Sequence, residues 1–501
     1  MPTDWDEVLT NRRRSRSVHN RTIATNRLAI VAADGVFSHF DLAETAARVA
    51  AELAQERGDL REARVAFLVP PSFAHVAIAR GIACAGGVAV PLAVSHPPAE
   101  LEYVVRDSGA SIVVASGRQS DALEEIAGRA GARFVRAADV LAGESEAAAH
   151  AAPGRRPPPD PARRAMILYT SGTTGKPKGV VTTHAQMAAR IATLLEAWEW
   201  TAADRALSVL PLHHVHGIVN VVGCALAAGA SCDILPQFDV EATWDRLASG
   251  EVTVFSAVPT IYHRLIAAWD AAPAAIRRVR SEGARGLRLM MSGSAALPRT
   301  ILERWCAITG HTLLERYGMT ELGMVLANPL HGERRPGFVG TPLPGVEVRL
   351  VDGELQVRGP NVFHEYWGRP AETRDAFDDE WFRTGDVAAF ENGAYRLLGR
   401  SSVDIIKSGG HKLSALEIEE AVRTHASVAD CFVVGETDEE WGERVEVTVE
   451  LAPGASLTLS ELQEWLTPRL APSKIPRALH VAAALPRNAL GKIMKAKRTR
   501  L

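Results

Sequence analysis

The glycine-rich stretch from Tyr169 to Gly179 (YTSGTTGKPKG) constrains this chain most. It holds three glycines, four serine or threonine hydroxyls and two lysines within eleven residues. An apolar run leads into it, and the β-prone run Val180–Thr183 follows it. Successive backbone N–H groups and hydroxyls in a glycine loop form a concave site for anions, and the lysine charge suits a polyphosphate. The stretch therefore predicts a loop that grips the phosphates of a nucleoside triphosphate.

This loop differs from the common P-loop, in which G-x-x-x-x-G-K-[ST] opens a helix. Thr170 stands where that pattern has its first glycine, and Pro177 follows Lys176. Gly179 disfavours a helix after the lysines. We expect a strand, a loop and a second strand. A plain surface hairpin is the alternative, although the Thr, Gly and Lys content exceeds what a turn requires.

The composition bounds the class of protein. At 501 residues the chain predicts two or more domains. Its 47% apolar and 23% charged content is typical of soluble globular proteins, and a net charge of −3 implies no general attraction to nucleic acid or an anionic membrane. Five scattered cysteines without a C-x-x-C pair favour a reducing, cytoplasmic setting. No apolar signal segment opens the chain, and the longest apolar run, Ile218–Cys232, is short for a membrane span.

Apolar runs and helical patterns alternate in the first part of the chain. Val65–Val69, Val88–Leu92 and Ile112–Ala115 read as buried strands, separated by helical patterns over Phe73–Ala85 and Glu100–Asp107. This rhythm predicts an α/β fold with a mostly parallel sheet flanked by helices.

The pattern changes twice towards the end of the chain. Short strands and turns predict a small β-rich subdomain at about residues 342–400. Residues 401–501 mix helical and strand patterns and predict a small α+β C-terminal domain. The N-terminal domain would then cover residues 1–400, with the glycine loop at residues 169–179.

Three close histidines, His213, His214 and His216, raise the question of zinc. A zinc site needs a fourth ligand in a defined geometry, and no cysteine stands near them in the sequence. Packing or substrate contact is the favoured interpretation.

Three further segments place polar groups at turns. Residues 292–296 (SGSAA) follow an apolar strand, where α/β sheets bind ligands, although a mere strand–helix turn explains them equally. In Glu315–Glu321 (ERYGMTE) an aromatic ring could stack a base, and a carboxylate could hold Mg²⁺. Asp386 and Arg400 could bind a ribose diol, or be a turn aspartate and a surface arginine.

Taken together, these segments resemble the acyl-adenylate-forming superfamily of AMP-dependent synthetases and ligases. The likeness runs from about Leu28 to Met494 and follows the family's order of motifs. The motifs are Tyr169–Gly179, Arg316–Glu321, Thr384–Asp386, Gly399–Gly410 and Asn488–Lys492. The resemblance implies a large N-terminal domain of stacked sheets, a hinge just after Arg400 and a mobile C-terminal domain. It also implies ATP and coenzyme A as co-substrates, and Mg²⁺ as cofactor.

The resemblance assigns roles to residues at the matching positions. The triphosphate would be held by Thr170, Ser171, Gly172, Thr173, Thr174, Gly175 and Lys178. The adenine would be lined by Ser294, Ala295, Glu315, Tyr317 and Gly318, and Met319 belongs to the same nucleotide-binding segment. Thr320 and Glu321 would serve phosphate and Mg²⁺, and Asp386 and Arg400 would bind the ribose hydroxyls. Coenzyme A would meet Ser408, Gly409, Gly410 and Lys412.

Lys492 would reach the reacting atoms during adenylation. A carboxylate oxygen attacks the α-phosphorus of ATP and pyrophosphate leaves, so cationic groups must stand where negative charge develops. Thr170, Glu321 and His214 are further candidates for the catalytic set. The C-terminal domain would then rotate and present its glycines to coenzyme A. Family hinges usually carry Asp or Lys two residues after Gly-Arg; here Ser402 stands there, with Asp404 near by.

Within the superfamily, the closest likeness is to malonyl-CoA synthetases. It lies in residues 211–217, 258–264, 292–298, 315–321 and 407–412, with His213 where Phe is common and His411 where Tyr is usual. The distal carboxylate of malonate is costly to bury without a cation, and arginine offers a bidentate match.

The candidates for the acid site are Arg264 and Arg316, assisted by His214 and Ser292. Arg264 has a plain alternative, because it could simply flank the apolar stripe of its helix.

Three hypotheses follow. The first is an ATP-dependent malonate:CoA ligase, with methylmalonate as a further substrate. The second is a ligase for another short-chain or aryl acid, or an adenylase that loads a carrier protein. The third is a non-catalytic nucleotide-binding protein, which the intact Lys492, Glu321 and Asp386 oppose.

Overall fold

The computed structural model describes residues 26–143, 159–170, 176–401, 403–408, 411–438, 441–487 and 493–495. The chain forms two compact units. The first comprises Met1–Tyr169, Val181–His184 and Glu199–Gln237, and the second Thr170–Val180, Ala185–Trp198 and Phe238–Leu501. The predicted boundary at residue 400 concerns a hinge and stays a prediction.

A parallel sheet forms the centre of the first unit. Its strand order is β7-β4-β3-β5-β6, and the register is parallel throughout. The strands are β3 (Arg64–Leu68), β4 (Val88–Pro91), β5 (Ile112–Ala115), β6 (Arg133–Arg136) and β7 (Arg164–Thr170). β4 and β5 are buried along their whole length, as expected for a sheet covered on both faces. The predicted alternation of strands and helices is confirmed.

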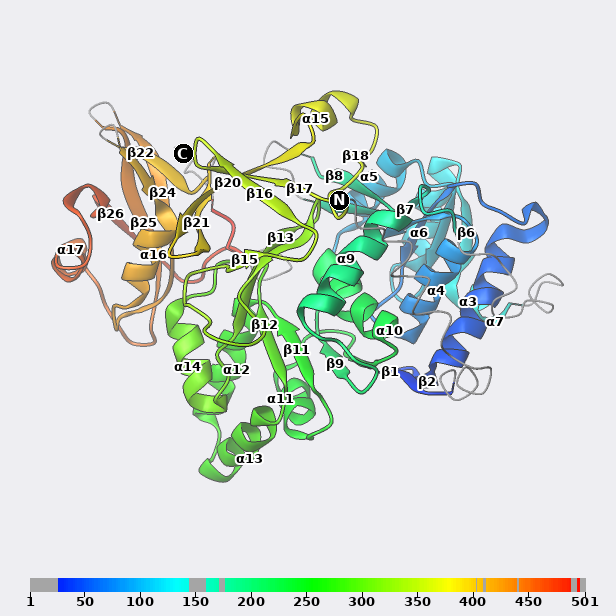
Figure 1. The fold of residues 1–501 in the computed structure, drawn as a ribbon, viewed down its shortest axis with the longest axis horizontal. Helices are drawn as coiled ribbons and strands as arrows, with labels where there is room; N and C mark the ends of the chain where they lie inside the picture. Colours follow the sequence, from blue (N-terminus) through cyan, green and yellow to red (C-terminus); the bar gives the residue numbers. More distant parts are fainter. Residues whose placement is uncertain are drawn as a thin grey trace. The chain divides into compact units, whose positions relative to one another are not determined.

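Five helices accompany this sheet in the described part of the first unit. They are α3 (His39–Ala54), α4 (Phe73–Cys84), α5 (Pro98–Ser108), α6 (Ser120–Ala130) and α7 (Ala137–Ala142), with a 3₁₀ turn η1 (Gln55–Arg57) after α3. Helices α3, α4 and α7 pack against one another, and α5 packs against α6 (Figure 1). A capping box between Ser38 and Asp41 fixes the start of α3.

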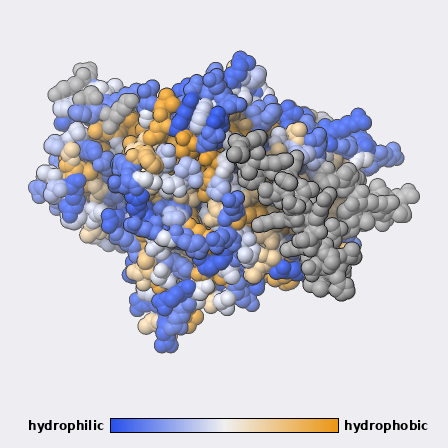
Figure 2. All heavy atoms as spheres, in the orientation of Figure 1, coloured by the Kyte–Doolittle hydropathy of each residue, from blue (hydrophilic) through white to orange (hydrophobic). Residues whose placement is uncertain are grey.

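A second group of strands in the first unit has the order β9-β10-β1-β2. It comprises β1 (Leu28–Ala32), β2 (Gly35–Ser38), β9 (Arg205–Ser208) and β10 (Ser231–Ile234). The long apolar run of the sequence forms the π-helix η2 (His216–Gly223), the short α10 (Cys224–Ala228) and β10. Among the described residues, no helix is long and apolar enough to cross a membrane. Hydrophilic residues dominate the face seen in Figure 2, with apolar residues scattered between them.

The second unit contains the strands that carry most of the candidate site. β11 (Val254–Ala257), β12 (Leu289–Ser292) and β13 (Leu314–Met319) are parallel neighbours, and β14 (Gly323–Ala327) and β15 (Thr341–Pro342) continue antiparallel. The helices are α9 (His184–Ala197), α11 (Val240–Ala248), α12 (Pro259–Ala271), α13 (Ala274–Arg285) and α14 (Arg299–Thr309). Trp244, Tyr262 and Trp305 pack ring against ring in the core between these helices.

The predicted β-rich subdomain is an antiparallel sheet. Its order is β16-β17-β20-β19, with β21 also paired to β20. The strands are β16 (Glu347–Val351), β17 (Glu354–Arg358), β19 (Phe377–Asp378), β20 (Trp381–Glu391) and β21 (Ala394–Arg400). The short β18 (Glu365–Tyr366) and α15 (Pro370–Asp375) lie between β17 and β19 in the chain, and β8 (Lys178–Thr183) follows the glycine loop.

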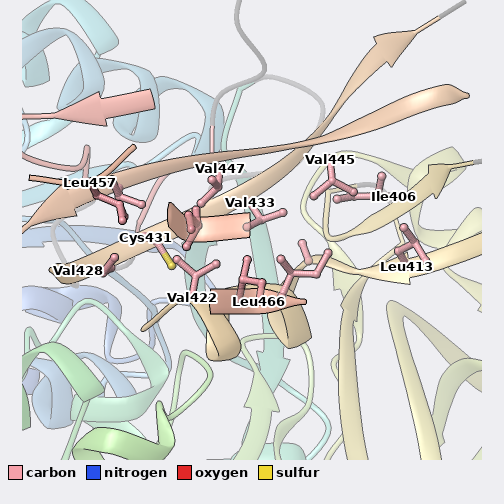
Figure 3. Packing of buried hydrophobic residues seen from close by; sticks show 14 residues of the cluster. Ile406, Leu413, Val422, Val428, Cys431, Val433, Val445, Val447, Leu457 and Leu466 are labelled. Carbon is pink, nitrogen blue, oxygen red and sulfur yellow. The ribbon is translucent and has the colours of Figure 1, made fainter. Parts of the chain in front are cut away.

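The C-terminal part of the second unit has a core of its own. Strands β22 (Ile405–Ser408), β23 (His411–Ser414), β24 (Val428–Asp438), β25 (Gly442–Leu451) and β26 (Ala478–Ala482) form one sheet. Helices α16 (Ala415–Arg423) and α17 (Leu459–Leu466) precede the 3₁₀ turn η3 (Pro472–Lys474). Side chains from α16, α17 and four strands meet in one apolar cluster, in which Val422 and Leu466 face Val433 and Val447 (Figure 3). The predicted α+β character is confirmed.

Candidate functional site

Two of the predicted nucleotide residues form a pair across neighbouring strands. Asp386 on β20 lies directly opposite Arg400 on β21, and Arg400 Nε donates to Asp386 Oδ1 at 2.9 Å. The hydroxyl of Tyr317 on β13 donates to the other oxygen, Oδ2, at 2.6 Å. A carboxylate has further lone pairs, so Asp386 can still accept a bond from a ribose hydroxyl. Three residues that are far apart in the sequence therefore meet, and their role at the ribose stays a prediction.

These contacts shift the ionisation of both partners of Asp386. Burial and the adjacent Asp386 carboxylate raise the pKa of Tyr317 well above its usual value. Burial lowers and Asp386 raises the pKa of Arg400, and the net shift is upward. The phenol therefore stays protonated as a donor, and the guanidinium stays charged.

Glu315 and the residues before it form the neighbouring edge of the site. The Glu315 side chain is buried, and its Oε1 accepts a bond from the Leu297 backbone N–H at 3.3 Å. Burial raises the pKa of Glu315 to about 8. Ser294, in the turn after β12, is exposed and adopts a left-handed backbone with φ of 69°, a conformation that non-glycine residues adopt rarely.

Glu321, the predicted Mg²⁺ residue, sits in the turn between β13 and β14. Its side chain is buried, which raises its pKa, and Tyr366 donates a hydrogen bond to its Oε1 at 3.0 Å. A single carboxylate beside phosphate oxygens is a donor set that Mg²⁺ accepts. Among the described residues, no group of three or more His, Cys, Asp or Glu side chains is placed to hold a metal ion. Glu321 therefore suits a metal that arrives with the triphosphate.

Arg190 on α9 holds the backbone around Glu321. Its guanidinium is buried and donates to the carbonyl oxygens of Asn361, Thr320 and Glu321 at 2.8, 3.0 and 2.7 Å. Gly323 makes room for this side chain, because a Cβ there would lie 3.0 Å from the Arg190 stem, and its φ of +66° also favours glycine.

Part of the glycine loop lies outside the described residues. Strands β7 and β8 flank it, as predicted, and Thr170 is the last residue of β7. Residues Ser171, Gly172, Thr173, Thr174 and Gly175 fall in the gap. Lys178 on β8 pairs with the Glu372 carboxylate and lies over the Tyr366 ring, 5.3 Å from its centroid.

Arg316 is the candidate for the acid site that the structure buries. It follows Glu315 on β13, it is only 3% exposed, and its Nη2 donates to Ser256 Oγ at 3.1 Å. A Cβ on Gly293 would overlap its guanidinium. Ser256 and Ser292 lie near the carboxyl ends of the parallel strands β11 and β12, where such sheets bind ligands. Arg316 lies on the neighbouring strand β13, one residue after Glu315, which pairs with Ser292. The Ser292 hydroxyl is buried and has no hydrogen-bond partner among the described residues.

The other two acid-site candidates come from other segments of the chain. Arg264 is exposed on α12. His214 belongs to the first unit, where its ring centroid is 4.1 Å from that of His213. Burial lowers the pKa of His214 to about 4 and that of His213 to about 2, so both rings are neutral at pH 7. Their roles at the acid site stay predictions.

The predicted coenzyme A residues surround a turn between β22 and β23. Ser408 is buried and lies opposite His411. Gly409, Gly410 and the Lys412 side chain lie outside the described residues, as does Lys492.

The two ends of the Lys492 segment are anchored. Arg487 forms an isolated antiparallel β-bridge with Ile493, and its Nη2 donates a hydrogen bond to Asp430 Oδ2 at 2.5 Å. Lys495 pairs with Asp404 at 2.5 Å and with Glu419 at 2.6 Å.

Comparison with known families identifies the family of the chain. A family model described as "AMP-binding enzyme" matches residues 19–367, and its C-terminal domain model matches residues 417–492. The chain belongs to the AMP-binding enzyme family. The resemblance to adenylate-forming enzymes is thereby confirmed, and Tyr317, Glu321 and the glycine loop all fall within the matched range.

Relatives within this AMP-binding family are similar over most of the chain. The mitochondrial malonate–CoA ligase of Bos taurus is 44% identical over 94% of this chain and 87% of its own length. The malonate–CoA ligase of Arabidopsis thaliana is 43% identical over 87% and 78%. The ATP-bound MatB structure from Rhodopseudomonas palustris is 34% identical, covers 94% of each chain and superimposes with a TM-score of 0.85.

Three residues that contact the candidate site were missed by sequence reasoning. Arg190, Tyr366 and Glu372 belong to no motif, and their partners lie far away in the sequence, up to the 194 positions between Lys178 and Glu372. Ser256 could have been found, since it is a serine near the carboxyl end of the apolar run that forms the parallel strand β11.

Proposed function

We propose that this enzyme is an ATP-dependent malonate:CoA ligase that forms malonyl-AMP and then malonyl-CoA, with methylmalonate as a further substrate. The observation that carries the proposal is the buried guanidinium of Arg316 on β13, which faces Gly293 and is hydrogen-bonded to Ser256. The names of the bovine and Arabidopsis relatives support the same acid. A solved malonyl-CoA ligase with methylmalonyl-CoA and AMP bound, 36% identical with a TM-score of 0.67, supports both acids.

Arg316 suits a dicarboxylate for electrostatic reasons. A buried cation beside small side chains favours an anionic group that would otherwise be costly to desolvate. The Ser292 hydroxyl, buried without a partner among the described residues, offers a second hydrogen bond. A fatty acid chain would leave the guanidinium facing hydrocarbon, which is unfavourable.

The first half-reaction joins the acid to AMP. A malonate oxygen attacks the α-phosphorus of ATP, a new P–O bond forms, and the bond to pyrophosphate breaks. Asp386 holds the ribose, Tyr317 lies beside it, and Lys178 with the glycine loop holds the phosphates. Glu321 would hold Mg²⁺, which when bound neutralises charge on the phosphate oxygens. Lys492 would bridge the carboxylate and the α-phosphate as a compact cation.

The second half-reaction releases AMP. The thiolate of coenzyme A attacks the malonyl carbonyl, a C–S bond forms, and AMP leaves with the oxygen that came from malonate. The turn between β22 and β23 would present the glycines to coenzyme A.

The cytoplasmic setting stays a prediction, and the bovine relative is named as mitochondrial.

A competition assay tests the choice of acid. The purified enzyme receives ATP, Mg²⁺, coenzyme A and equal concentrations of malonate, methylmalonate, acetate, hexanoate and benzoate, and the thioesters are separated by mass. Malonyl-CoA should dominate. A preference for hexanoate over malonate would refute the dicarboxylate claim.

Matched variants test the arginines. Arg316→Lys keeps the charge but loses the planar fork, so kcat/KM for malonate should fall at least ~10-fold, which is about 1.4 kcal/mol, while the value for acetate changes less. Arg264→Ala should also weaken malonate use by ~10-fold if a charge-assisted contact is lost. The exposed Arg278→Ala on α13 serves as control. An unchanged kcat/KM removes the tested arginine from the acid site.

A further inference from the structure

Tyr366 touches two groups that the proposed reaction needs. Its hydroxyl donates to Glu321 Oε1 at 3.0 Å. The Lys178 ammonium lies 5.3 Å from the centroid of its ring. One side chain therefore connects the carboxylate of the β13–β14 turn with a lysine of the triphosphate loop.

The backbone next to Tyr366 makes the same two connections. The N–H of Trp367 donates to the carbonyl of Gly179, the neighbour of Lys178, at 2.8 Å, and the N–H of Phe363 donates to the carbonyl of Glu321 at 2.7 Å. Each connection is thus made once by the main chain and once by the side chain. Such duplication fixes the tyrosine relative to both groups.

The charged groups around Tyr366 are complementary to its ring face and to its hydroxyl. The ring face attracts the Lys178 ammonium, and Glu372 pairs with the same ammonium. The hydroxyl donates to a buried carboxylate, a charge-assisted bond that is stronger than a neutral one. Arg190 on α9 fixes the backbone of Glu321. The hydrogen bond from Tyr366 therefore sets the orientation of the Glu321 carboxylate.

We propose that Tyr366 is a positioning residue for adenylation: its hydroxyl orients the Glu321 carboxylate towards the metal-bound triphosphate, and its ring holds Lys178 beside the same phosphates. This inference rests on the proposed function in so far as ATP is the nucleotide. Ligating carboxylates are commonly oriented by hydrogen bonds from such residues, and losing one typically costs ~10- to 100-fold in metal affinity or activity.

The two contacts can be separated by substitution. Tyr366→Phe removes the hydroxyl and leaves the ring under Lys178 and its packing on Phe363, whose ring centroid lies at 4.7 Å. Tyr366→Leu removes both contacts. Tyr395→Phe, a tyrosine of β21 that packs on Phe390, is the matched control for loss of a hydroxyl.

The test combines ATP binding by calorimetry, with and without Mg²⁺ and without any acid, and pyrophosphate release at varied Mg²⁺. For Tyr366→Phe we expect ATP affinity without Mg²⁺ to be unchanged, the gain in affinity on adding Mg²⁺ to be reduced, and kcat of pyrophosphate release to fall ~10-fold with the KM for acid unchanged. Tyr366→Leu should weaken ATP binding even without Mg²⁺. The control should match wild type.

Wild-type values for Tyr366→Phe in both the Mg²⁺-dependent binding and kcat would overturn the inference. A lowered melting temperature with unchanged Mg²⁺ dependence would also overturn it, because that result describes a structural role only. The calorimetry contains no acid, so it stands whichever acid the enzyme uses. If the malonate assay fails while ATP binding is intact, the proposed function is refuted, and the inference about Tyr366 still stands.

Discussion

Arg190→Met tests how the turn that carries Glu321 is held. The substitution replaces a buried cation by a shorter, neutral and unbranched side chain. It removes the three hydrogen bonds to the carbonyls of Asn361, Thr320 and Glu321. We expect a less stable protein and, because the backbone of Glu321 loses its support, a lower rate of adenylation.

The magnitude follows from two opposing effects. Each buried carbonyl left without a donor costs about 1–3 kcal/mol, so the three together cost about 3–9 kcal/mol. Burial lowers the pKa of Arg190 from 12.5 to about 10, a drop that corresponds to about 3 kcal/mol of unfavourable charge burial, which methionine relieves. The net loss is about 3 kcal/mol, enough to lower the melting temperature by about 5 °C in a unit of this size.

Thermal unfolding followed by circular dichroism measures this loss. The melting temperature of Arg190→Lys should lie between those of wild type and Arg190→Met, because lysine keeps the charge without the planar fork of the guanidinium. Arg278→Met, at an exposed position of α13, is the control and should unfold like wild type. If Arg190→Met had the same melting temperature as wild type, the three carbonyls would not need the guanidinium for stability, and the reasoning would be refuted.

Two further predictions concern buried charge. Glu315 has a pKa of about 8 in the folded chain against 4.5 when solvated, so its contribution to stability is complete below pH 4.5 and is lost as the pH rises to 8. The free energy of unfolding of wild type relative to Glu315→Gln should therefore fall by up to about 1.4 kcal/mol per pH unit over that window, and parallel pH profiles of the two proteins would contradict the assignment. Lys495→Met leaves the Asp404 and Glu419 carboxylates without their shared cation, which should destabilise the protein by about 3 kcal/mol. Lys474→Met, which breaks the more exposed pair with Glu417, should cost less than about 1 kcal/mol, and equal losses in the two variants would refute the difference in burial.

The sequence predicted the parts of the fold that depend on local pattern. The buried apolar runs that became β3, β4 and β5 are continuous; α4 begins at the side-chain cap Ser72, and α5 begins at a proline. The β-rich segment was recognisable because turn residues recur at short intervals. These features require only neighbours in the chain.

The rest of the site depends on contacts between distant segments. Arg190 reaches residues 130, 131 and 171 positions away, and no spacing in the sequence announces that. Tyr366 meets Glu321 and Lys178 only because β18 lies next to Gly179. The exposure of Arg264 agrees with the alternative that it flanks the apolar stripe of α12. Arg316 was predicted from its motif, but its burial beside Gly293 came from the packing of β12 against β13.

Oxygen transfer from malonate to AMP tests the central claim most directly. The enzyme is supplied with malonate labelled with ¹⁸O in its carboxylates, unlabelled ATP, Mg²⁺ and coenzyme A, and the nucleotide product is analysed by mass spectrometry. The account predicts AMP that carries one ¹⁸O, because the attacking oxygen stays on phosphorus when the thiol displaces AMP. Unlabelled AMP, or ADP with labelled phosphate, would contradict it.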